Sequence, residues 1–151
     1  MSGNYILRKA KNSAGLVTDV VIEAGRISST ASVEVAHEVV DCEGLVVLPG
    51  FVDLHTHLRE PGFEQSETVA SGSRSAAAGG YTAIHAMANT FPVADTAGVV
   101  EQVARLGFDA GLVFVQPIGA VTIGLKGEQL AELGAMAQSK AKVRIFSDDG
   151  N

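Results

Sequence analysis

Short runs of alternating hydrophobic and polar residues characterise the beginning of the chain. Residues 5–29 have the pattern of short strands, with a turn expected at residues 23–25 and a returning hairpin arm at residues 26–28. Another strand is expected over residues 33–40. Together these segments predict a β segment over residues 1–44 that is too small to fold well alone.

The pattern changes at Leu45, where longer apolar runs begin to alternate with amphipathic segments. The apolar runs predict strands over residues 45–54, 81–87, 111–116 and 142–146. The amphipathic segments predict helices over residues 67–78, 97–106 and 125–139. Nearly continuous apolar strands alternating with helices indicate a parallel sheet covered by helices.

This βαβαβαβ order is typical of a (β/α)₈ barrel and also of an open α/β sheet. Both place functional residues at the carboxyl ends of the strands. A full barrel takes about 250 residues, whereas this chain has 151 and at most four βα units. We therefore expect residues 45–151 to be the front half of a larger α/β domain, truncated in this chain.

Composition narrows the classes of protein that fit. Hydrophobic residues make up 46% and charged residues 19%, as expected of a globular protein. The net charge of −6 and the absence of a basic cluster argue against nucleic-acid binding. The start of the chain lacks the pattern of a signal peptide. The apolar run at residues 45–54 has about half the length of a membrane helix. The single cysteine, Cys42, fits a reducing compartment. We expect a soluble, cytoplasmic protein with no membrane partner.

The strongest chemical signal is the pair His55 and His57 at the end of the first long apolar strand. Residues i and i+2 share one face of a strand, so both imidazoles are expected to point the same way and to bind one metal ion, with zinc as the expected ion. Arg59 is expected to continue this alternation. The competing interpretation is a pair of hydrogen-bonded structural histidines, but the position between Asp53 and Arg59 at a strand end favours metal binding.

Asp148 and Asp149 follow the fourth predicted strand and so belong at the same edge of the sheet as the histidines. Either could be a carboxylate ligand, including one that bridges two metal ions. Asp-Asp-Gly is also ordinary turn chemistry. Two adjacent acids on one edge need positive charge nearby, which a metal ion supplies.

Four other side chains are weaker candidates. Arg59 could bind a substrate carboxylate in a two-pronged contact, or could pair at the surface with a neighbouring glutamate. Asn89 could add a hydrogen bond to the same carboxylate, or could cap its own turn. His85 fits a satisfied core histidine, and His37 is expected at the surface.

The stretch at residues 49–62, with the sequence PGFVDLHTHLREPG, resembles the signature of the bacterial dihydroorotases, in the amidohydrolase superfamily. Three further stretches agree with this resemblance, at residues 76–82, 87–90 and 146–150. The resemblance implies a (β/α)₈ TIM-type barrel preceded by a small β-sandwich segment that both chain ends build. It therefore implies an α/β fold in which residues 45–151 are the first half of the barrel.

Carried over residue by residue, the resemblance implies that His55 and His57 are zinc ligands and that Arg59 and Asn89 bind the substrate carboxylate. It implies a metal-bridging carboxylate at the aspartate pair, for which we favour Asp149, and one or two zinc ions per subunit. The family's two further histidine ligands and its proton-transferring aspartate would lie beyond residue 151. No catalytic residue of that kind is therefore expected within this chain.

The resemblance implies zinc-dependent, reversible hydrolysis of dihydroorotate to N-carbamoyl-aspartate in pyrimidine biosynthesis, with these 151 residues alone expected to be inactive. A related cyclic amidase such as an allantoinase or dihydropyrimidinase is the nearest alternative, and Arg59 favours a substrate that carries a carboxylate. A non-catalytic scaffold protein is the alternative from another class. The partners implied are the small-molecule substrate and, in addition, either a second copy in a homodimer or aspartate carbamoyltransferase.

Overall fold

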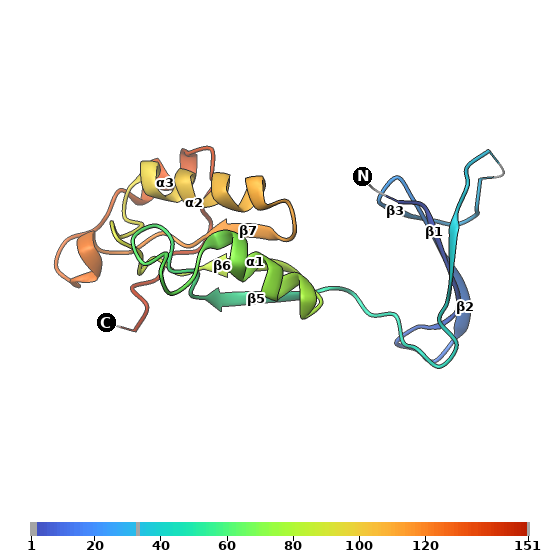
Figure 1. The fold of residues 1–151 in the computed structure, drawn as a ribbon. Helices are drawn as coiled ribbons and strands as arrows, with labels where there is room; N and C mark the ends of the chain where they lie inside the picture. Colours follow the sequence, from blue (N-terminus) through green and yellow to red (C-terminus); the bar gives the residue numbers. More distant parts are fainter. Residues whose placement is uncertain (1–2, 33, 151) are drawn as a thin grey trace. The chain divides into compact units, whose positions relative to one another are not determined.

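In the computed structural model, which describes residues 3–32 and 34–150, the chain divides into two units, Met1–Pro49 and Gly50–Asn151. Figure 1 labels their helices and strands. Within the described part of the chain, no helix combines the length and apolar character needed to span a membrane.

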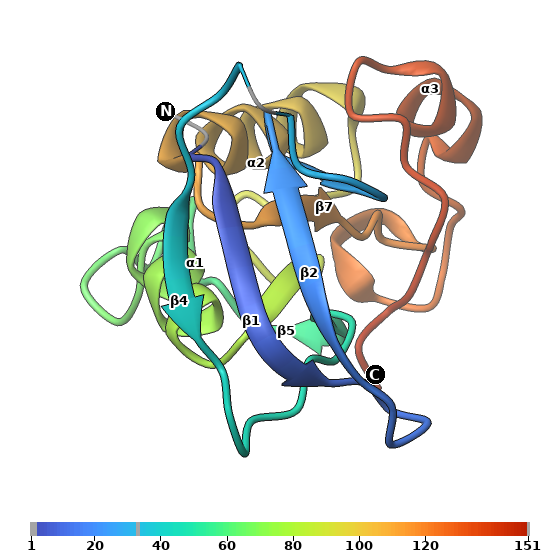
Figure 2. The ribbon, with the colours of Figure 1, turned by 90° about the vertical axis from the view of Figure 1, so that its right-hand side faces the viewer.

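The first unit is a four-stranded sheet in the order β3-β2-β1-β4. Its strands are β1 (Tyr5–Lys11), β2 (Val17–Glu23), β3 (Arg26–Ser28) and β4 (Glu38–Asp41). Strand β2 pairs antiparallel with both β1 and β3. Strand β4 pairs parallel to β1, and Figure 2 shows β4, β1 and β2 side by side. Ala24 and Gly25 both have positive φ in the turn between β2 and β3, which suits the twist of a tight hairpin. The predicted hairpin is thereby confirmed.

The strand predicted over residues 33–40 is wrong in its extent, because β4 begins only at Glu38. Residue 33 lies outside the described residues. Glu23 Oε1 accepts a hydrogen bond from Ser32 N at 2.6 Å and lies 2.8 Å from His37 Nε2. The Ser32 bond, followed by the His37 contact, lowers the pKa of Glu23. Because both contacts turn this segment against β2, it cannot run extended along β1, and His37 is largely buried rather than exposed.

The second unit is built on a parallel sheet in the order β5-β6-β7. Its strands are β5 (Phe51–Thr56), β6 (Tyr81–Ala86) and β7 (Phe114–Pro117). Helix α1 (Val69–Ala78) connects the first two strands and α2 (Ala97–Ala110) connects the next two. Both helices pack on one face of the sheet (Figure 1). The predicted α/β class with a parallel, helix-covered sheet is confirmed.

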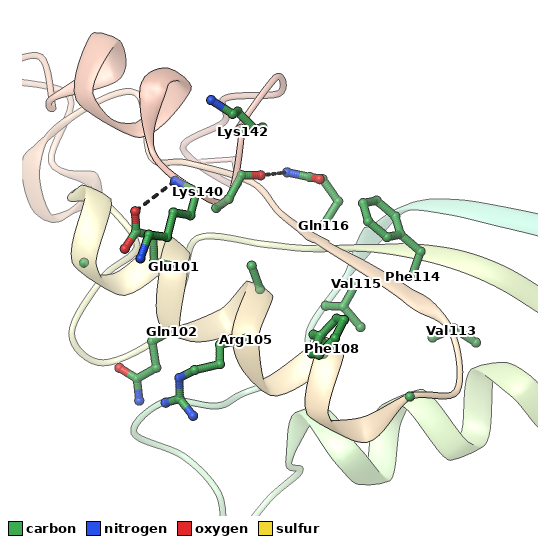
Figure 3. Close-up of a pocket in the computed structure, with 15 residues that line it drawn as sticks. Glu101, Gln102, Arg105, Phe108, Val113, Phe114, Val115, Gln116, Lys140 and Lys142 are labelled. Atoms are coloured by element: carbon green, nitrogen blue, oxygen red, sulfur yellow. Dashed lines mark hydrogen bonds between the residues drawn. The ribbon is translucent and has the colours of Figure 1, made fainter.

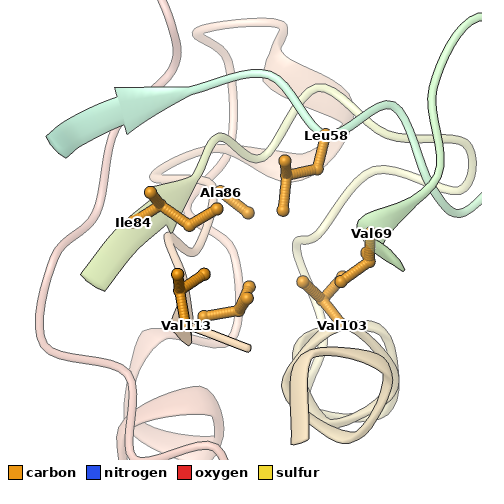
Figure 4. Close-up of a cluster of buried hydrophobic side chains, with 7 residues drawn as sticks. Leu58, Val69, Ile84, Ala86, Val103 and Val113 are labelled. Atoms are coloured by element: carbon orange, nitrogen blue, oxygen red, sulfur yellow. The ribbon is translucent and has the colours of Figure 1, made fainter. Parts of the chain in front are cut away.

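A small apolar core fills the space between this sheet and its two helices (Figure 4). Ile84 and Val115 of the sheet meet Val69 of α1 and Val103 of α2, all nearly inaccessible to solvent. Gly107 of α2 lies so close to β7 that an added Cβ would come within 2.4 Å of Val115. The core therefore fixes helix against strand at van der Waals distance.

The first long apolar run is divided between the two units, so the strand predicted over residues 45–54 is wrong at its beginning. Val46 forms a parallel bridge with Lys11, and Val47 N donates to the Lys11 carbonyl at 2.8 Å. Pro49 follows and has no N–H to continue a ladder. Strand β5 therefore begins at Phe51.

The helix predicted over residues 125–139 is mostly wrong. The observed elements are a short 3₁₀ helix, Ile123–Leu125, and α3 (Leu133–Gln138). Leu125 and Gly127 have positive φ, which interrupts a right-handed helix, and Thr122 pairs antiparallel with Leu130. The apolar residues in this segment therefore belong to a tight turn and a short helix, and not to one continuous helix.

The strand predicted over residues 142–146 is also wrong, because only an isolated bridge joins Phe146 to Gly119. Lys142 has a φ of 51°, which breaks the extended conformation at the start of the segment. Gly119 N still donates to the Ile145 carbonyl, and Ser147 N donates to the Gly119 carbonyl, at 3.1 and 3.0 Å. The segment therefore runs beside the end of β7 and delivers Asp148 and Asp149 to the expected edge of the sheet.

The contact between Gly107 and Val115 allows a test of this packing. Gly107→Ala should lower the free energy of unfolding by about 1–3 kcal/mol, because the added methyl group meets a buried side chain with no room to move. Urea unfolding followed by circular dichroism measures the change. The matched control is Gly98→Ala on the same helix, where nothing lies within 4 Å of the added Cβ and stability should be unchanged or slightly raised. Equal stability of both variants would contradict the close packing.

Candidate metal centre at the carboxyl edge of the parallel sheet

Strand β5 carries His55 near its carboxyl end, and His57 follows directly after the strand. The pairing between β5 and β6 is irregular between Asp53 and Thr56, and His55 N donates to Asp53 Oδ1 at 2.9 Å. The centroids of the two imidazole rings lie 5.1 Å apart. The prediction that the two rings lie side by side is confirmed.

Asp149 joins the two histidines across 94 residues of sequence. His55 Nε2 lies 3.0 Å from Asp149 Oδ1, and His57 Nδ1 lies 3.9 Å from Asp149 Oδ2. One potential ligand atom from each of the three residues can be chosen so that all lie within 4.8 Å of one another. Two imidazoles and one carboxylate form a donor set found in catalytic zinc sites, so the residues present fit this ion.

Asp148 turns away from the histidines. Its Oδ1 accepts hydrogen bonds from the N–H groups of Val121 and Thr122, both at 2.9 Å, and its Oδ2 accepts one from the Thr122 hydroxyl at 2.7 Å. The Thr122 hydroxyl and then the Thr122 N–H lower the pKa of Asp148 below its usual range. The geometry thus brings Asp149, and not Asp148, to the imidazoles.

Asn89, which follows β6, lies in the same cluster. Its Nδ2 donates to Asp149 Oδ2 at 2.6 Å and lies 3.0 Å from His57 Nδ1. The side chain therefore links a histidine to the carboxylate instead of capping its own turn. A substrate carboxylate could bind this amide only if one of these contacts were given up.

Arg59 is placed differently from the expectation. The prediction that it continues the alternation of β5 is wrong, because the strand ends at Thr56 and Arg59 has a φ of 59°. The two glutamates that could pair with it accept backbone N–H groups instead: Glu60 from Val69 at 2.7 Å and Glu64 from Gly62 at 2.8 Å. Among the described residues no carboxylate forms an ion pair with Arg59.

The loop that carries Arg59 is nevertheless joined to the loop that carries Asn89. Phe91 N donates to the Pro61 carbonyl at 2.9 Å. Gly62, at a φ of 102°, lies so close to Phe91 that an added Cβ would come within 2.2 Å of the Phe91 carbonyl oxygen. The two loops therefore lie directly against one another.

The remaining candidate, His85, has a structural partner. Its Nδ1 lies 3.1 Å from the Asp53 carbonyl oxygen, across the pair β5 and β6. This contact agrees with the interpretation of His85 as a satisfied histidine within the sheet. Sequence reasoning missed Thr122, whose hydroxyl binds a carboxylate 26 residues away, and no local pattern marks it.

Comparisons with known proteins place these observations in a family. A family model described as dihydro-orotase-like matches residues 44–151. The chain belongs to this dihydro-orotase-like family. It is 61% identical over 148 residues to the dihydroorotase of Leifsonia xyli subsp. xyli, and 61% identical over 148 residues to that of Streptomyces coelicolor. These alignments cover 97% and 96% of the chain but only 34% of either relative, so the chain spans about a third of their length.

Solved structures agree with this membership. The L-hydantoinase (dihydropyrimidinase) from Arthrobacter aurescens superposes with a TM-score of 0.65 and 25% identity, over 82% of this chain and 29% of that one. A D-hydantoinase superposes with a TM-score of 0.53 over 87% of this chain and 36% of that one; at 19% identity it supports the fold alone. The resemblance to the dihydroorotases drawn from the motifs is confirmed.

Proposed function

We propose that this dihydro-orotase-like chain contributes one part of the active site of a zinc-dependent enzyme that interconverts dihydroorotate and N-carbamoyl-aspartate. The observation that carries the proposal is the convergence of His55, His57 and Asp149 at the carboxyl edge of the parallel sheet. The curated relatives named dihydroorotase support the choice of substrate. The substrate is thus a cyclic amide, and water adds across its ring C–N bond.

The three clustered residues would hold the zinc. When bound there, zinc would supply a Lewis acid for the amide carbonyl and a water of lowered pKa. The role of the chain's own residues would be to fix the position of the substrate at this edge. Asp149 would remain deprotonated as a ligand, and His55 and His57 would each present a neutral imidazole nitrogen.

Arg59 would bind the ring carboxylate of the substrate. Its guanidinium has no carboxylate partner among the described residues, and Arg suits two-pronged binding of a carboxylate. Asn89 would assist from the adjacent loop, which Phe91 joins to the Arg59 loop. Holding the carboxylate orients the ring, and orientation is a large part of the rate enhancement.

We also propose that the predicted β segment, which in the structure extends beyond residue 44 to Pro49, belongs to a small β-sandwich, and that the second unit, Gly50–Asn151, is the first part of a (β/α)₈ barrel. The cross-strand row Val52, Ala83 and Phe114 faces away from the helices, because the next row, with Ile84 and Val115, lies in the core. This row is apolar, with Val52 and Phe114 exposed and Ala83 half-buried, as expected for side chains that line the inside of a barrel that has not closed.

An apolar groove beside α2 and β7 supports the same proposal (Figure 3). Phe108 and Phe114 line it and are 86% and 62% exposed. The curated relatives are about three times as long as this chain, so their further βα units are the expected occupants. The barrel of the longer protein would bury Phe108 of α2 against its next βα unit, and Phe114, on the other face of β7, inside the closed barrel.

Zinc binding tests the central proposal. The purified chain should bind zinc, and the double variant His55→Ala/His57→Ala should lose it, because removing two of three ligands leaves a single carboxylate. Metal analysis after dialysis against a weak chelator measures this. His85→Ala is the matched control, since its imidazole contacts a backbone carbonyl outside the cluster, and it should retain zinc. Equal zinc in the wild type and the double variant would argue against the site.

The 151 residues alone should not hydrolyse dihydroorotate. The chain would supply three ligands and one carboxylate-binding loop, and none of the three clustered residues would be free to donate a proton to the leaving nitrogen. A spectrophotometric assay of ring opening, with zinc supplied, tests this. Measurable turnover that the double variant abolishes would overturn the expectation.

Arg59 distinguishes a dihydroorotase from a hydantoinase. Arg59→Gln should weaken dihydroorotate binding roughly 10- to 100-fold, because charge-assisted hydrogen bonds to the carboxylate are lost. Binding of unsubstituted hydantoin, which has no carboxylate, should be unchanged. Ligand titration of the zinc-loaded chain, observed by NMR, gives both affinities. Equal weakening of both ligands would favour the related cyclic amidases.

A further inference from the structure

Asp148 precedes the clustered Asp149 in the sequence, but its carboxylate forms its hydrogen bonds with Val121 and Thr122. We propose that Asp148 and Thr122 are positioning residues that hold Asp149 against the two histidines. This inference rests on the proposed function, because it concerns the same half-site. It assigns a role to two residues whose side chains form hydrogen bonds with one another and not with the clustered side chains.

The contacts between Asp148 and the loop at residues 119–122 use both oxygens of the carboxylate. Oδ1 accepts two backbone N–H groups and Oδ2 accepts the Thr122 hydroxyl. Thr122 Oγ1 in turn accepts a hydrogen bond from Gly127 N at 2.9 Å, and Thr122 is 9% exposed. The hydroxyl is therefore fixed from both sides and cannot rotate freely.

The backbone before Asp148 is attached to the same loop. Ser147 N donates to the Gly119 carbonyl, and Gly119 N donates to the Ile145 carbonyl. Residues 145–148 thus meet the loop after β7 at consecutive points. With this side of the segment occupied, the next side chain, that of Asp149, emerges towards His55 at 3.0 Å.

The backbone conformation of Asp149 explains why the segment needs this attachment. Its φ is 56°, a left-handed value that most non-glycine residues avoid and that Asp and Asn adopt more readily than the others. Asp149 N donates to Ser147 Oγ at 3.1 Å, which by itself is a local turn contact. The hydrogen bonds of Asp148 supply the long-range anchor that keeps the turn in place. Both oxygens of Asp148 are engaged in these bonds, and Asp148 is not among the residues whose ligand atoms cluster.

The test compares Thr122→Val, which removes the hydroxyl, with Thr122→Ser, which retains it. Zinc affinity of the purified chain, measured by competition with a chelator, should fall roughly 10- to 100-fold in Thr122→Val, as for other residues that orient metal ligands. Thr122→Ser, which keeps the hydroxyl, should have a zinc affinity close to that of the wild type. Ser139→Ala is the control for stability alone, since it removes a buried hydroxyl that bonds the Met136 carbonyl in α3.

A second readout is independent of metal. In the metal-free protein, long-range ¹H–¹⁵N NMR of the His55 ring reports the contact between Nε2 and Asp149. This signal should change in Thr122→Val and return in Thr122→Ser. Wild-type zinc affinity together with an unchanged His55 signal in Thr122→Val would overturn the inference. If the wild type bound no zinc, the proposed function would fail, and the His55 signal alone would decide the positioning role.

Discussion

The parallel pairing of β5, β6 and β7 is the constraint on which the candidate site depends. Parallel strands bring their carboxyl ends to one edge, so residues that follow β5 and β6 become neighbours although 32 positions separate them. His57 and Asn89 meet in this way. The same edge receives Asp149 through a single bridge between Gly119 and Phe146, where no regular strand forms. Side chains that no local sequence motif would group together form a cluster because the parallel pairing of the strands fixes their positions.

This pairing is stable only because the helices cover one face of the sheet. Ile84 and Val115 are buried beneath α1 and α2, and Gly107 allows α2 to approach β7 closely. Burial of these side chains is the dominant favourable contribution to folding of the unit. The opposite face keeps Val52 and Phe114 exposed, so the sheet is covered on one side only. The carboxyl edge of the sheet is therefore held in place by packing on the face that α1 and α2 cover.

Sequence reasoning succeeded where period and spacing determine the outcome. The i, i+2 relation placed His55 and His57 together, and the alternation of strands and helices gave the parallel sheet. It failed where single residues adopt unusual backbone angles. Leu125 and Lys142 have positive φ without being glycine, so nothing in the hydrophobic pattern shows that a helix or strand is interrupted there. It also could not divide the apolar run after Leu45, because the pairing of Val46 with Lys11 is a tertiary choice.

The choice between the two adjacent acids shows what the structure adds. Both carboxylates reach the same edge, but the donors around them differ. Asp148 accepts hydrogen bonds from two N–H groups and a hydroxyl, and these three bonds stabilise its negative charge without a cation. Asp149 meets two imidazoles and one amide, and the imidazoles and the carboxylate offer ligand atoms within 4.8 Å of one another. The N–H and O–H donors around Asp148 hold its carboxylate in place, which suits a structural role. The imidazoles beside Asp149 can bind a cation together with its carboxylate, which suits a metal ligand.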